Sequence, residues 1–467
     1  MAPHRFNPTI LREYDIRGTV GKTLSVADAT AIGRAFGTIV LAEGKGKAVC
    51  VGYDGRVSSP DLEAGLVEGL TSTGVDVVRV GRGPTPQLYY SVFHLESDGG
   101  IMVTGSHNPP DQNGFKLVLG RKAFHGANIA RLGRLAADGA FAQGKGSVTD
   151  KDVRANFLNE LVAGYTAGTS GRPLTVAWDP GNGAGGEMVE RLIPRLPGRH
   201  IAMNTVIDGT FPAHHPDPAE EKNLRQLKEA VFANKADVGL AFDGDGDRLG
   251  VVDSTGNTIM PDQLLALFAV DVLAASPGAT VIADVKSSQM LFDEVARLGG
   301  KPLMWKTGHA LIKAKMADTK SPLAGELSGH MFFADRYYGY DDALYAAVRL
   351  LSFLAGSKQT LAEMVAHLPK WVNTPEMRVH CAEDRKFVVI TELQQRLRDS
   401  GADVSDIDGV RVTTADGWWL VRASNTEAAL VVRAEARDAS GLTRVQAALK
   451  EQLGLSGVQL VPAASHH

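Results

Sequence analysis

The stretch "VGLAFDGDGDRLGVVD", residues 238–253, sets an acidic loop between two apolar segments. Its aspartates Asp243, Asp245 and Asp247 alternate with glycines, so a strand-like or tightly turned backbone points their carboxylates the same way. The apolar flanks should bury the base of the loop, which argues against an ordinary solvated acidic turn. Three adjacent carboxylates repel one another unless a cation lies among them. Such oxygen ligands suit Mg²⁺, which keeps positions free for phosphate or water.

The acidic loop belongs to the second of three similar units. An apolar strand stops at an aspartate in each of them: "AVCVGYD" at Asp54, "LTVAWD" at Asp179 and "TVIAD" at Asp284. A helical stretch, a second strand and a third short strand follow, and the third runs into "VTGSHNPP", "LAFDGDGDRLG" or "LAGELSGH". This alternation predicts βαβ units with mainly parallel sheets. Ligands bind at the carboxyl ends of such strands, where all three loops are expected.

The chain divides into four predicted domains, because 467 residues exceed one ordinary core. After about residue 370 the pattern changes, and "GVRVTTADGWWLVRASNTEAALVVRAEA" alternates like antiparallel strands. The fold class predicted is α/β: three similar α/β domains with mixed sheets and a C-terminal α+β domain. The predicted boundaries are 1–152, 153–256, 257–370 and 371–467.

Composition and charge exclude several classes of partner. A formal net charge of −4 gives no strong field for nucleic acid or an anionic membrane. The N-terminus lacks an apolar run of signal-peptide length, and no segment offers about 18 consecutive apolar residues. Cys50 and Cys381 match no metal spacing and are expected to be buried thiols. We therefore expect a cytoplasmic monomer without nucleic-acid or membrane partners.

Ser106 stands in the Gly/Asn/Pro-rich loop of the first unit. Taken alone, a serine before Asn-Pro indicates turn chemistry. Beside a divalent cation it gains another role, because it could carry a phosphoryl group whose oxygens the metal neutralises. His107 and Lys116 would add positive charge nearby.

The loop of the third unit offers Glu326, Ser328 and His330. A carboxylate and a hydroxyl two positions apart could bind vicinal sugar hydroxyls. Histidine has the ordinary pKa closest to neutrality, which suits proton transfer. A capped loop with a surface histidine explains the same residues equally well.

A fourth polar loop, "RASNT", occupies residues 422–426 of the last domain. Arginine, hydroxyl and amide donors together make an anion cradle, although an Asx-type turn is an equal alternative. This cradle consists of Arg422, Ser424, Asn425 and Thr426, ahead of a predicted strand that ends in Arg433.

Four motifs in order, "TGSHNP", "DGDGDR", "GELSGH" and "RASNTE", resemble those of the α-D-phosphohexomutases. The shorter stretches "REYDIRG", "FPAHHPDP", "TGHALIK" and "NGFK" extend the likeness over essentially the whole chain. It is strongest with the bacterial phosphomannomutase/phosphoglucomutase branch. The resemblance implies four domains around one deep cleft.

The resemblance also implies a mechanism. Phosphorylated Ser106 would donate its phosphoryl group to a hexose monophosphate, giving a hexose 1,6-bisphosphate that turns over and returns its other phosphate. Mg²⁺ would be bound by the three aspartates and a phosphoserine oxygen. The implied catalytic residues are Ser106, His330, Lys116, Arg17 and His107. The implied substrate-binding residues are Tyr14, Arg248, Lys286, Gly308, His309, Glu326, Ser328, Arg422, Ser424, Asn425, Thr426 and Arg433.

The remaining alternatives concern the sugar and the fate of the phosphate. Leu327 is apolar, as in the dual-specificity branch, which favours mannose and glucose over a strict phosphoglucomutase or a phosphoglucosamine mutase. A metal-dependent sugar phosphatase that hydrolyses its phosphoserine is a rival of another class. One departure is the pair Ala428–Ala429, where members of this family often have a proline; it removes none of the phosphate donors.

Overall fold

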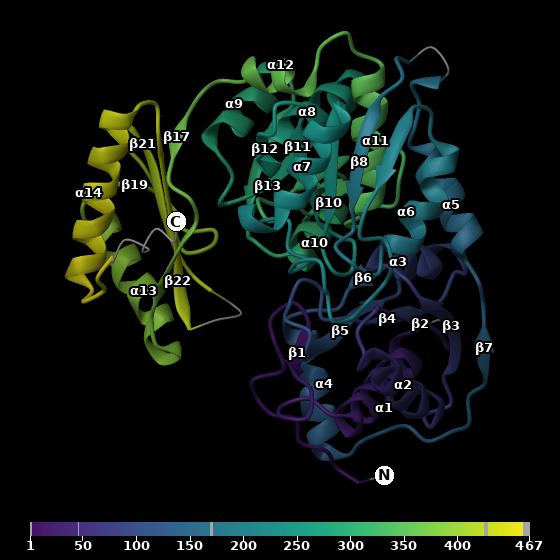
Figure 1. Cartoon of the computed structure of the whole chain (residues 1–467). Coiled ribbons are helices and arrows are strands. Elements are labelled where there is room, and N and C mark those ends of the chain that lie inside the picture. Colours follow the sequence, from purple (N-terminus) through teal and green to yellow (C-terminus); the bar gives the residue numbers. More distant parts are fainter. Residues whose placement is uncertain (1, 45, 169–170, 425–427, 461–467) are drawn as a thin grey trace.

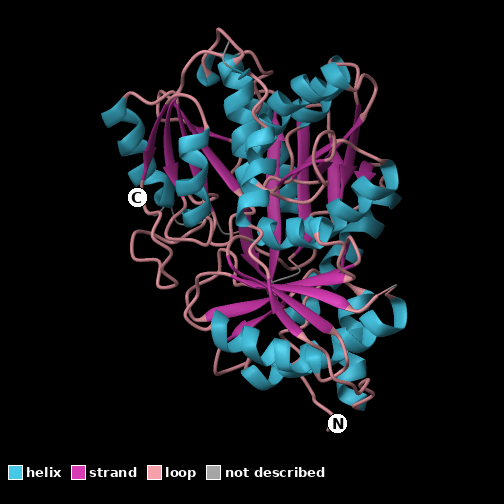
Figure 2. Ribbon diagram, turned by 90° about the vertical axis from the view of Figure 1, so that its right-hand side faces the viewer, coloured by secondary structure: helices cyan, strands magenta, loops and turns pink. Residues whose placement is uncertain are grey.

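The computed structural model describes residues 2–44, 46–168, 171–424 and 428–460. It contains four β-sheets that follow one another along the chain (Figure 1). We call each sheet with its helices a unit, numbered I to IV. Helices lie against the sheets of all four units (Figure 2).

Units I to III repeat one arrangement of strands. The strand orders β4-β2-β3, β10-β8-β9 and β15-β13-β14 are equivalent, and all six pairings are parallel. An antiparallel strand, β5, β11 or β16, then lies beside the third strand of each unit. The repeat and the mixed sheets predicted from the sequence are confirmed. Each polar loop connects the third strand to this antiparallel strand.

The strands of units I to III have the following bounds. Those of unit I are β1 (Ile16–Thr19), β2 (Ala48–Tyr53), β3 (Asp76–Arg82), β4 (Gly99–Val103), β5 (Gln112–Leu119), β6 (Lys122–Ala123) and β7 (Val148–Asp150). Those of unit II are β8 (Thr175–Asp179), β9 (Arg199–Ala202), β10 (Val238–Phe242), β11 (Leu249–Asp253) and β12 (Thr258–Ile259). Those of unit III are β13 (Thr280–Asp284), β14 (Lys301–Trp305), β15 (Leu323–Gly325) and β16 (Met331–Phe333).

The helices of units I to III fill the connections between these strands. In unit I they are α1 (Val26–Glu43), α2 (Ser59–Thr71), α3 (Thr85–His94) and α4 (Ala127–Asp138). In unit II they are α5 (Arg154–Ala163), α6 (Gly186–Leu192) and α7 (Arg225–Asn234), with short 3-10 turns at Ile193–Arg195 and Glu221–Leu224. In unit III they are α8 (Pro261–Ala275), α9 (Gln289–Arg297), α10 (His309–Thr319), α11 (Ala343–Ala355) and α12 (Leu361–Ala366).

Local sequence explains where α1 begins and why α1 and α2 pack closely. Ser25 and Asp28 form a capping box at the start of α1, which satisfies free backbone amides there. α1 and α2 pack closely because both carry glycines at the crossing. A Cβ atom at Gly69 would lie 2.1 Å from the carbonyl oxygen of Thr30, so a larger residue would push the helices apart.

Unit IV is an antiparallel sheet with two helices, as predicted. Its strands are β17 (Val372–Asn373), β18 (Met377–His380), β19 (Asp403–Ser405), β20 (Val410–Thr413), β21 (Gly417–Ala423) and β22 (Ala429–Ala436). Its helices are α13 (Glu383–Asp399) and α14 (Ala439–Leu455). Figure 1 shows this unit to one side of the other three.

The buried cores explain this separation. One continuous cluster joins units II and III and includes residues of α3, such as Tyr89 and Tyr90, from unit I. Unit IV has a core of its own. A small cluster of Val285, Trp418 and Leu420 lies where it meets unit III. Unit IV is therefore joined to the rest by a modest apolar contact.

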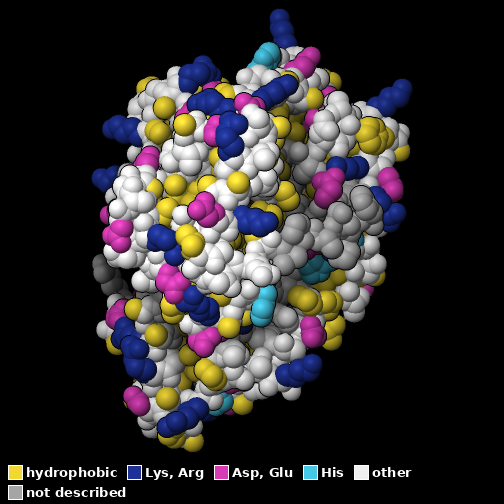
Figure 3. All heavy atoms as spheres, turned by 90° about the vertical axis from the view of Figure 1, so that its left-hand side faces the viewer, with side chains coloured by type: hydrophobic (Ala, Val, Ile, Leu, Met, Phe, Trp, Pro, Cys, Tyr) yellow, Lys and Arg dark blue, Asp and Glu magenta, His cyan; other side chains and the backbone are white. Residues whose placement is uncertain are grey.

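The surface and the cysteines agree with the composition. Lysine, arginine, aspartate and glutamate are interspersed on the face in Figure 3. Cys50 and Cys381 are both buried and unpaired. None of the described helices has the length and apolar character that crossing a membrane requires.

Candidate active site

Asp243, Asp245 and Asp247 form a compact buried group in the loop between β10 and β11. One oxygen from each lies within 4.8 Å of the others, and all three side chains are fully shielded from solvent. Burial and repulsion from its two neighbours raise the pKa of Asp243. Charges crowded in this way favour a cation among them.

The oxygens of this group differ in their hydrogen bonds. Asp243 Oδ1 accepts from the backbone amides of Asp247 (3.0 Å) and Arg248 (3.1 Å), which fixes the turn. Asp245 Oδ1 and Asp247 Oδ1 are buried without a hydrogen-bond partner among the described residues. Unpartnered carboxylate oxygens that converge in a buried loop fit a divalent metal ion.

Lys116, on β5, brings a positive charge from unit I to the same loop. Its Nζ donates to Asp245 Oδ2 at 2.7 Å and also to Asp247 Oδ2. Burial opposes the charge on Lys116, but the two carboxylates outweigh it and raise its pKa. Asp245 also accepts from the Thr85 hydroxyl at 2.5 Å, and its pKa is lowered because Lys116 outweighs burial.

Ser106 lies directly against the acidic loop. Its Oγ donates to Asp243 Oδ2 at 2.8 Å and lies 3.3 Å from His107 Nδ1. Its φ of 50° is in the left-handed region, which is uncommon for a residue with a side chain and often marks functional sites. A Cβ atom at Gly244 would lie 2.3 Å from the Ser106 carbonyl oxygen, so a glycine is needed where the two loops meet.

Arg56, which sequence reasoning missed, fixes the backbone of the loop that contains Ser106. Its guanidinium donates to four backbone carbonyls, those of Ser106 (2.7 Å), Asn108 (2.6 Å), Pro109 (2.5 Å) and Gln112 (2.9 Å). Burial lowers the pKa of Arg56, and the neighbouring Asp54 opposes that shift. The sequence did contain a signal for Arg56, because this residue comes directly after Asp54 and Gly55, where the first strand of the repeat ends in unit I and its loop begins.

Arg17 and His107 complete the surroundings of the serine. Arg17 Nη1 donates to the Gly105 carbonyl at 2.9 Å, and its Nε donates to Asp15 at 2.7 Å. Burial, with the nearby positive charges of Arg248 and Arg17, lowers the pKa of His107 well below its usual value. This shift disfavours the charged form of His107, so it does not support the positive charge expected there from the sequence.

His330 links units II and III. Its Nε2 accepts from Arg248 Nε at 3.1 Å. Its Nδ1 faces Asp341 Oδ2 at 3.2 Å and Asp247 Oδ1 at 3.5 Å, although neither contact has hydrogen-bond geometry. The ring stacks on that of His309, with centroids 5.6 Å apart.

Asp341 was not singled out by the sequence, yet it is fully buried beside both histidines. Its Oδ1 accepts from Lys313 Nζ at 2.7 Å, and its Oδ2 lies 3.4 Å from His309 Nδ1. Burial and the charge of Lys313 lower the pKa of His309 to about 4. Asp341 thus faces an ammonium group on one side and two imidazoles on the other.

The turn at Thr307 and Gly308 connects the sugar-binding candidates. Tyr14 donates its hydroxyl to the Thr307 carbonyl at 2.7 Å, and Gly308 N donates to Glu326 Oε1 at 2.5 Å. Gly308 has φ +132°, and a Cβ atom there would lie 2.5 Å from the Tyr14 ring. Burial raises the pKa of Glu326. Ser328 is half-buried in the loop that follows.

Lys286 and Arg433 lie where units III and IV meet. Lys286 Nζ donates to Glu376 Oε2 at 3.0 Å. Arg433 is buried and donates to the backbone carbonyl of Lys286. Arg433 therefore stabilises the backbone at Lys286.

Two of the four predicted phosphate donors of this loop are described, Arg422 and Ser424, and both are buried. Arg422 Nε donates to Asp408 Oδ2 at 3.0 Å, and the Ser424 carbonyl accepts from Lys386 at 2.7 Å. Asn425 and Thr426 lie outside the described residues. Asp408 and Lys386 are contacts that the sequence did not indicate.

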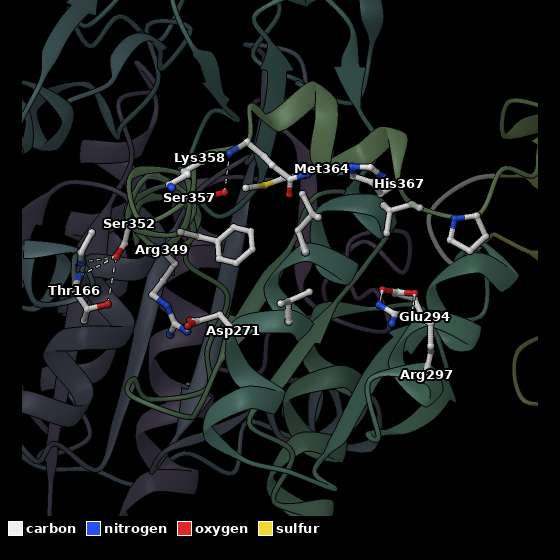
Figure 4. Close-up of a pocket in the computed structure, with 18 residues that line it drawn as sticks. Thr166, Asp271, Glu294, Arg297, Arg349, Ser352, Ser357, Lys358, Met364 and His367 are labelled. Atoms are coloured by element: carbon white, nitrogen blue, oxygen red, sulfur yellow. Dashed lines mark hydrogen bonds and ion pairs between the residues drawn. The ribbon is translucent and has the colours of Figure 1, made fainter. Parts of the chain in front are cut away.

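A cavity of about 820 Å³ lies away from these groups, between α8, α9, α11 and α12 (Figure 4). Two ion pairs lie in its lining: Arg349 donates to Asp271 at 2.7 Å, and Arg297 donates to Glu294 at 2.6 Å. No predicted site residue lines it. The candidate active site is therefore the group of contacts among Ser106, the acidic loop and His330, and not this cavity.

Models of four domains of one protein family match successive parts of the chain. The models of the phosphoglucomutase/phosphomannomutase α/β/α domains I, II and III match residues 8–129, 155–256 and 260–371. The model of the C-terminal domain of the same family matches residues 376–452.

Similar proteins cover nearly the whole chain. A phosphomannomutase/phosphoglucomutase of Pseudomonas aeruginosa is 44% identical over 445 residues, which is 95% of each chain. A phosphoglucomutase of Neisseria meningitidis is 43% identical over 441 residues, covering 94% of this chain and 95% of that one. The crystal structure of a phosphoglucomutase/phosphomannomutase family protein of Burkholderia thailandensis superposes with a TM-score of 0.91 at 43% identity, covering 98% and 99% of the two chains. The chain belongs to the phosphoglucomutase/phosphomannomutase family, within the α-D-phosphohexomutases.

Proposed function

We propose that this protein is a phosphohexomutase that interconverts hexose 1-phosphates and hexose 6-phosphates through phosphorylated Ser106. The observation that supports the proposal is the 2.8 Å hydrogen bond from Ser106 Oγ to Asp243 of the acidic loop. A serine among carboxylates alone would be a poor nucleophile for an anionic phosphate. The cations Lys116 and Arg17, both nearby, offset that repulsion.

In the proposed reaction, the phosphoryl group passes from Ser106 to a sugar hydroxyl and the second phosphate of the resulting hexose 1,6-bisphosphate returns to Ser106. Phosphoryl transfer has a loose, charge-spread transition state, so positioning and charge neutralisation dominate. Lys116 and Arg17 would stabilise the phosphoryl oxygens, while Arg56 keeps the loop backbone fixed through four carbonyls. A hexose 1,6-bisphosphate would also serve as activator.

Asp243, Asp245 and Asp247 would hold Mg²⁺ together with an oxygen of Ser106. When bound, the ion would neutralise phosphate charge and orient the transferring group. The two unpartnered carboxylate oxygens of the loop support this ligand set.

Proton transfer is assigned to His330. Arg248 donates to its Nε2, so that nitrogen can accept a proton only when Arg248 moves aside, and Asp341 Oδ2 faces its Nδ1 at 3.2 Å. His330 would accept the proton of the attacking sugar hydroxyl and return it in the second half-reaction. His107 would orient the Ser106 hydroxyl.

Substrate recognition is assigned to the loops of units III and IV. Glu326 and Ser328 would bind sugar hydroxyls, and Arg422 and Ser424 would grip the phosphate that is not transferred. Further substrate contacts are proposed for Tyr14, Arg248, Lys286, Gly308, His309, Asn425, Thr426 and Arg433. The apolar Leu327 favours use of both mannose and glucose phosphates.

We also propose that the domains divide at residues 152, 256 and 370, and that the protein acts as a cytoplasmic monomer on small sugar phosphates. The buried unpaired thiols Cys50 and Cys381 fit a reducing compartment. The proposed boundaries at 152 and 370 fall between two sheets, whereas the one at 256 separates β12 from β11, with which it pairs in the sheet of unit II.

A coupled assay tests the function. Glucose 1-phosphate, mannose 1-phosphate and glucosamine 1-phosphate are each supplied with catalytic glucose 1,6-bisphosphate. Turnover of the first two supports the dual-specificity proposal, and turnover of the third alone supports a phosphoglucosamine mutase. Stoichiometric release of inorganic phosphate would instead identify a phosphatase.

The matched variant is Ser106→Ala. It should lose nearly all turnover and also the phosphate adduct that intact-mass spectrometry is expected to find on the wild type. Substrate should still bind, because the proposed sugar contacts lie on other loops. Near-normal mutase activity in this variant would overturn the assignment of Ser106.

A further inference from the structure

The carboxylate of Asp408 joins unit IV to unit III. Asp408 lies between β19 and β20, and its Oδ2 accepts two hydrogen bonds of 3.0 Å. One comes from the backbone amide of Thr307, which follows β14, and the other comes from Nε of Arg422 on β21. A single oxygen therefore connects the arginine of the predicted phosphate loop to the turn beside the sugar-binding loop.

Thr307 is held on its other side as well. Its carbonyl accepts from Tyr14 of unit I, and the next amide, Gly308 N, donates to Glu326 of unit III. Asp408 supplies the contact from unit IV. The peptide at Thr307 is thus a point where three units meet, and Asp408 brings Arg422 to it.

The contact through Nε determines how Arg422 is presented. An arginine has five N–H donors in a rigid fork, and phosphate is gripped best by two parallel donors. Within the described part of the chain, Asp408 is the residue that accepts from Arg422, and it uses Nε. Among the described residues neither Nη1 nor Nη2 has an acceptor, so these two atoms can grip a phosphate. The side chains are 7% and 16% exposed, so solvent screens the pair weakly.

We propose that Asp408 is a positioning residue for the substrate phosphate: it fixes the guanidinium plane of Arg422 and ties that arginine to the Thr307 turn. This inference rests on the proposed function, in which Arg422 grips the phosphate that is not transferred. A side chain held before binding loses less freedom when the ligand arrives, which improves affinity. Burial opposes the charge on Arg422, but Asp408 outweighs it and raises its pKa, so the arginine stays charged.

A role in which Asp408 competes with the substrate phosphate would change KM in the opposite direction. If Asp408 competed with phosphate for Arg422, removing its charge would tighten substrate binding. If Asp408 positions Arg422, removing its charge loosens binding. The direction of the change in KM therefore distinguishes the two roles.

The variant Asp408→Asn keeps the size of the side chain and an oxygen acceptor for Thr307, but it removes the charge. It should raise KM for glucose 1-phosphate and mannose 1-phosphate about tenfold, while kcat stays within about threefold. Asp406→Asn is the matched control, because Asp406 lies in the same loop, is exposed, and pairs with Arg398. The control should behave like the wild type. An unchanged or lowered KM in Asp408→Asn would overturn the proposal.

A double variant separates positioning from general damage. In an Arg422→Ala background, adding Asp408→Asn should change KM less than about twofold, because the residue to be positioned is gone. A further tenfold rise in that background would show that Asp408 acts by another route and would refute the inference.

Amide hydrogen exchange gives a readout that does not depend on activity. Asp408→Ala should speed exchange at Thr307 about tenfold or more, whereas Asp406→Ala should leave it unchanged. Equal exchange in Asp408→Ala and the wild type would contradict the link. If the wild type itself turned over neither sugar phosphate, the proposed function would fail, and the exchange result would still decide whether Asp408 holds the Thr307 turn.

Discussion

Ser106 Oγ and Asp243 Oδ2 lie 2.8 Å apart although 137 positions separate the two residues in the chain. The contact exists because equivalent loops of units I and II, each following the third strand of its repeat, face each other. Lys116, on the next strand of unit I, likewise contacts the acidic loop of unit II, through Asp245. The proposed nucleophile and the proposed metal ligands therefore come from different copies of one structural repeat.

Asp245→Asn should weaken metal binding and activity together. The substitution removes one carboxylate charge from the group that would hold the ion and replaces one carboxylate oxygen with an amide nitrogen, which is a poor ligand for Mg²⁺. We expect the Mg²⁺ concentration for half-maximal activity to rise on the order of tenfold or more. Chelation of divalent metal should abolish wild-type turnover, and added Mg²⁺ should restore it. Asp237→Asn, which alters a carboxylate paired with Arg172, is the control. An unchanged half-saturating concentration in Asp245→Asn would place the metal elsewhere.

Arg56→Lys should disorganise the serine loop without removing charge. A lysine cannot reproduce a fork that reaches four carbonyls, so the loop should lose most of these contacts. We expect kcat to fall about 10- to 100-fold and the phosphorylated fraction to decrease, as measured by steady-state kinetics and intact mass. Arg79→Lys is the control, since Arg79 pairs with buried Glu63 in the same unit but does not contact the loop. If both variants had equal kcat, Arg56 would have no special role in the loop.

Asp341→Asn should slow the reaction while leaving substrate binding nearly intact. Asp341 faces Nδ1 of His330, and without its charge the imidazole is less well oriented and less basic. We expect kcat to fall about 10- to 100-fold with KM within about threefold. The neighbour Asp342 is a strict comparison, because it accepts from Tyr345 N at 2.9 Å and caps α11. Asp342→Asn retains an oxygen that can cap α11 and should largely spare kcat, so matching kcat values for the two variants would refute the distinction.

Sequence patterns were sufficient for the parts of the fold that repeat. Each strand that ends at Asp54, Asp179 or Asp284 carries its own apolar signature, and each polar loop follows after a helical stretch and two further strands. The order of strands in a parallel unit is strongly restricted once the βαβ pattern is known. The three loops could thus be assigned to equivalent positions before any distance was available.

Residues that act through tertiary contacts could not be found in this way. Asp341 and Asp342 are adjacent in "YGYDDALY", where either aspartate reads as a helix cap. Asp342 is the cap, and Asp341 faces two histidines from other segments. Asp408 similarly reads as part of a polar turn. Its contacts with Thr307 and Arg422 depend on how unit IV meets unit III, which no local pattern encodes.

Asp179, the aspartate that ends the first strand of unit II, makes a structural ion pair that should give stability a pH dependence. Its Oδ2 lies 2.9 Å from His214 Nε2. Burial lowers the pKa of His214, but the hydrogen bond and charge of Asp179 outweigh it, and the net shift is upward. A histidine whose folded pKa exceeds its unfolded value stabilises the protein fully below the unfolded pKa, about 6.5. That contribution is lost as pH rises through the higher folded value.

His214→Asn should therefore destabilise the protein more at pH 5.5 than at pH 9. The loss at pH 5.5 should be on the order of 1 kcal/mol or more, since a hydrogen bond between charged partners disappears. Urea unfolding at both pH values, followed by tryptophan fluorescence, measures it, because Trp178 lies in the same strand as Asp179. His215→Asn is the control, as His215 meets His214 through its backbone carbonyl, which the substitution retains. Equal destabilisation of His214→Asn at pH 5.5 and pH 9 would mean that the imidazolium form of His214 contributes nothing to folding, and that its contact with Asp179 is only the hydrogen bond of a neutral ring.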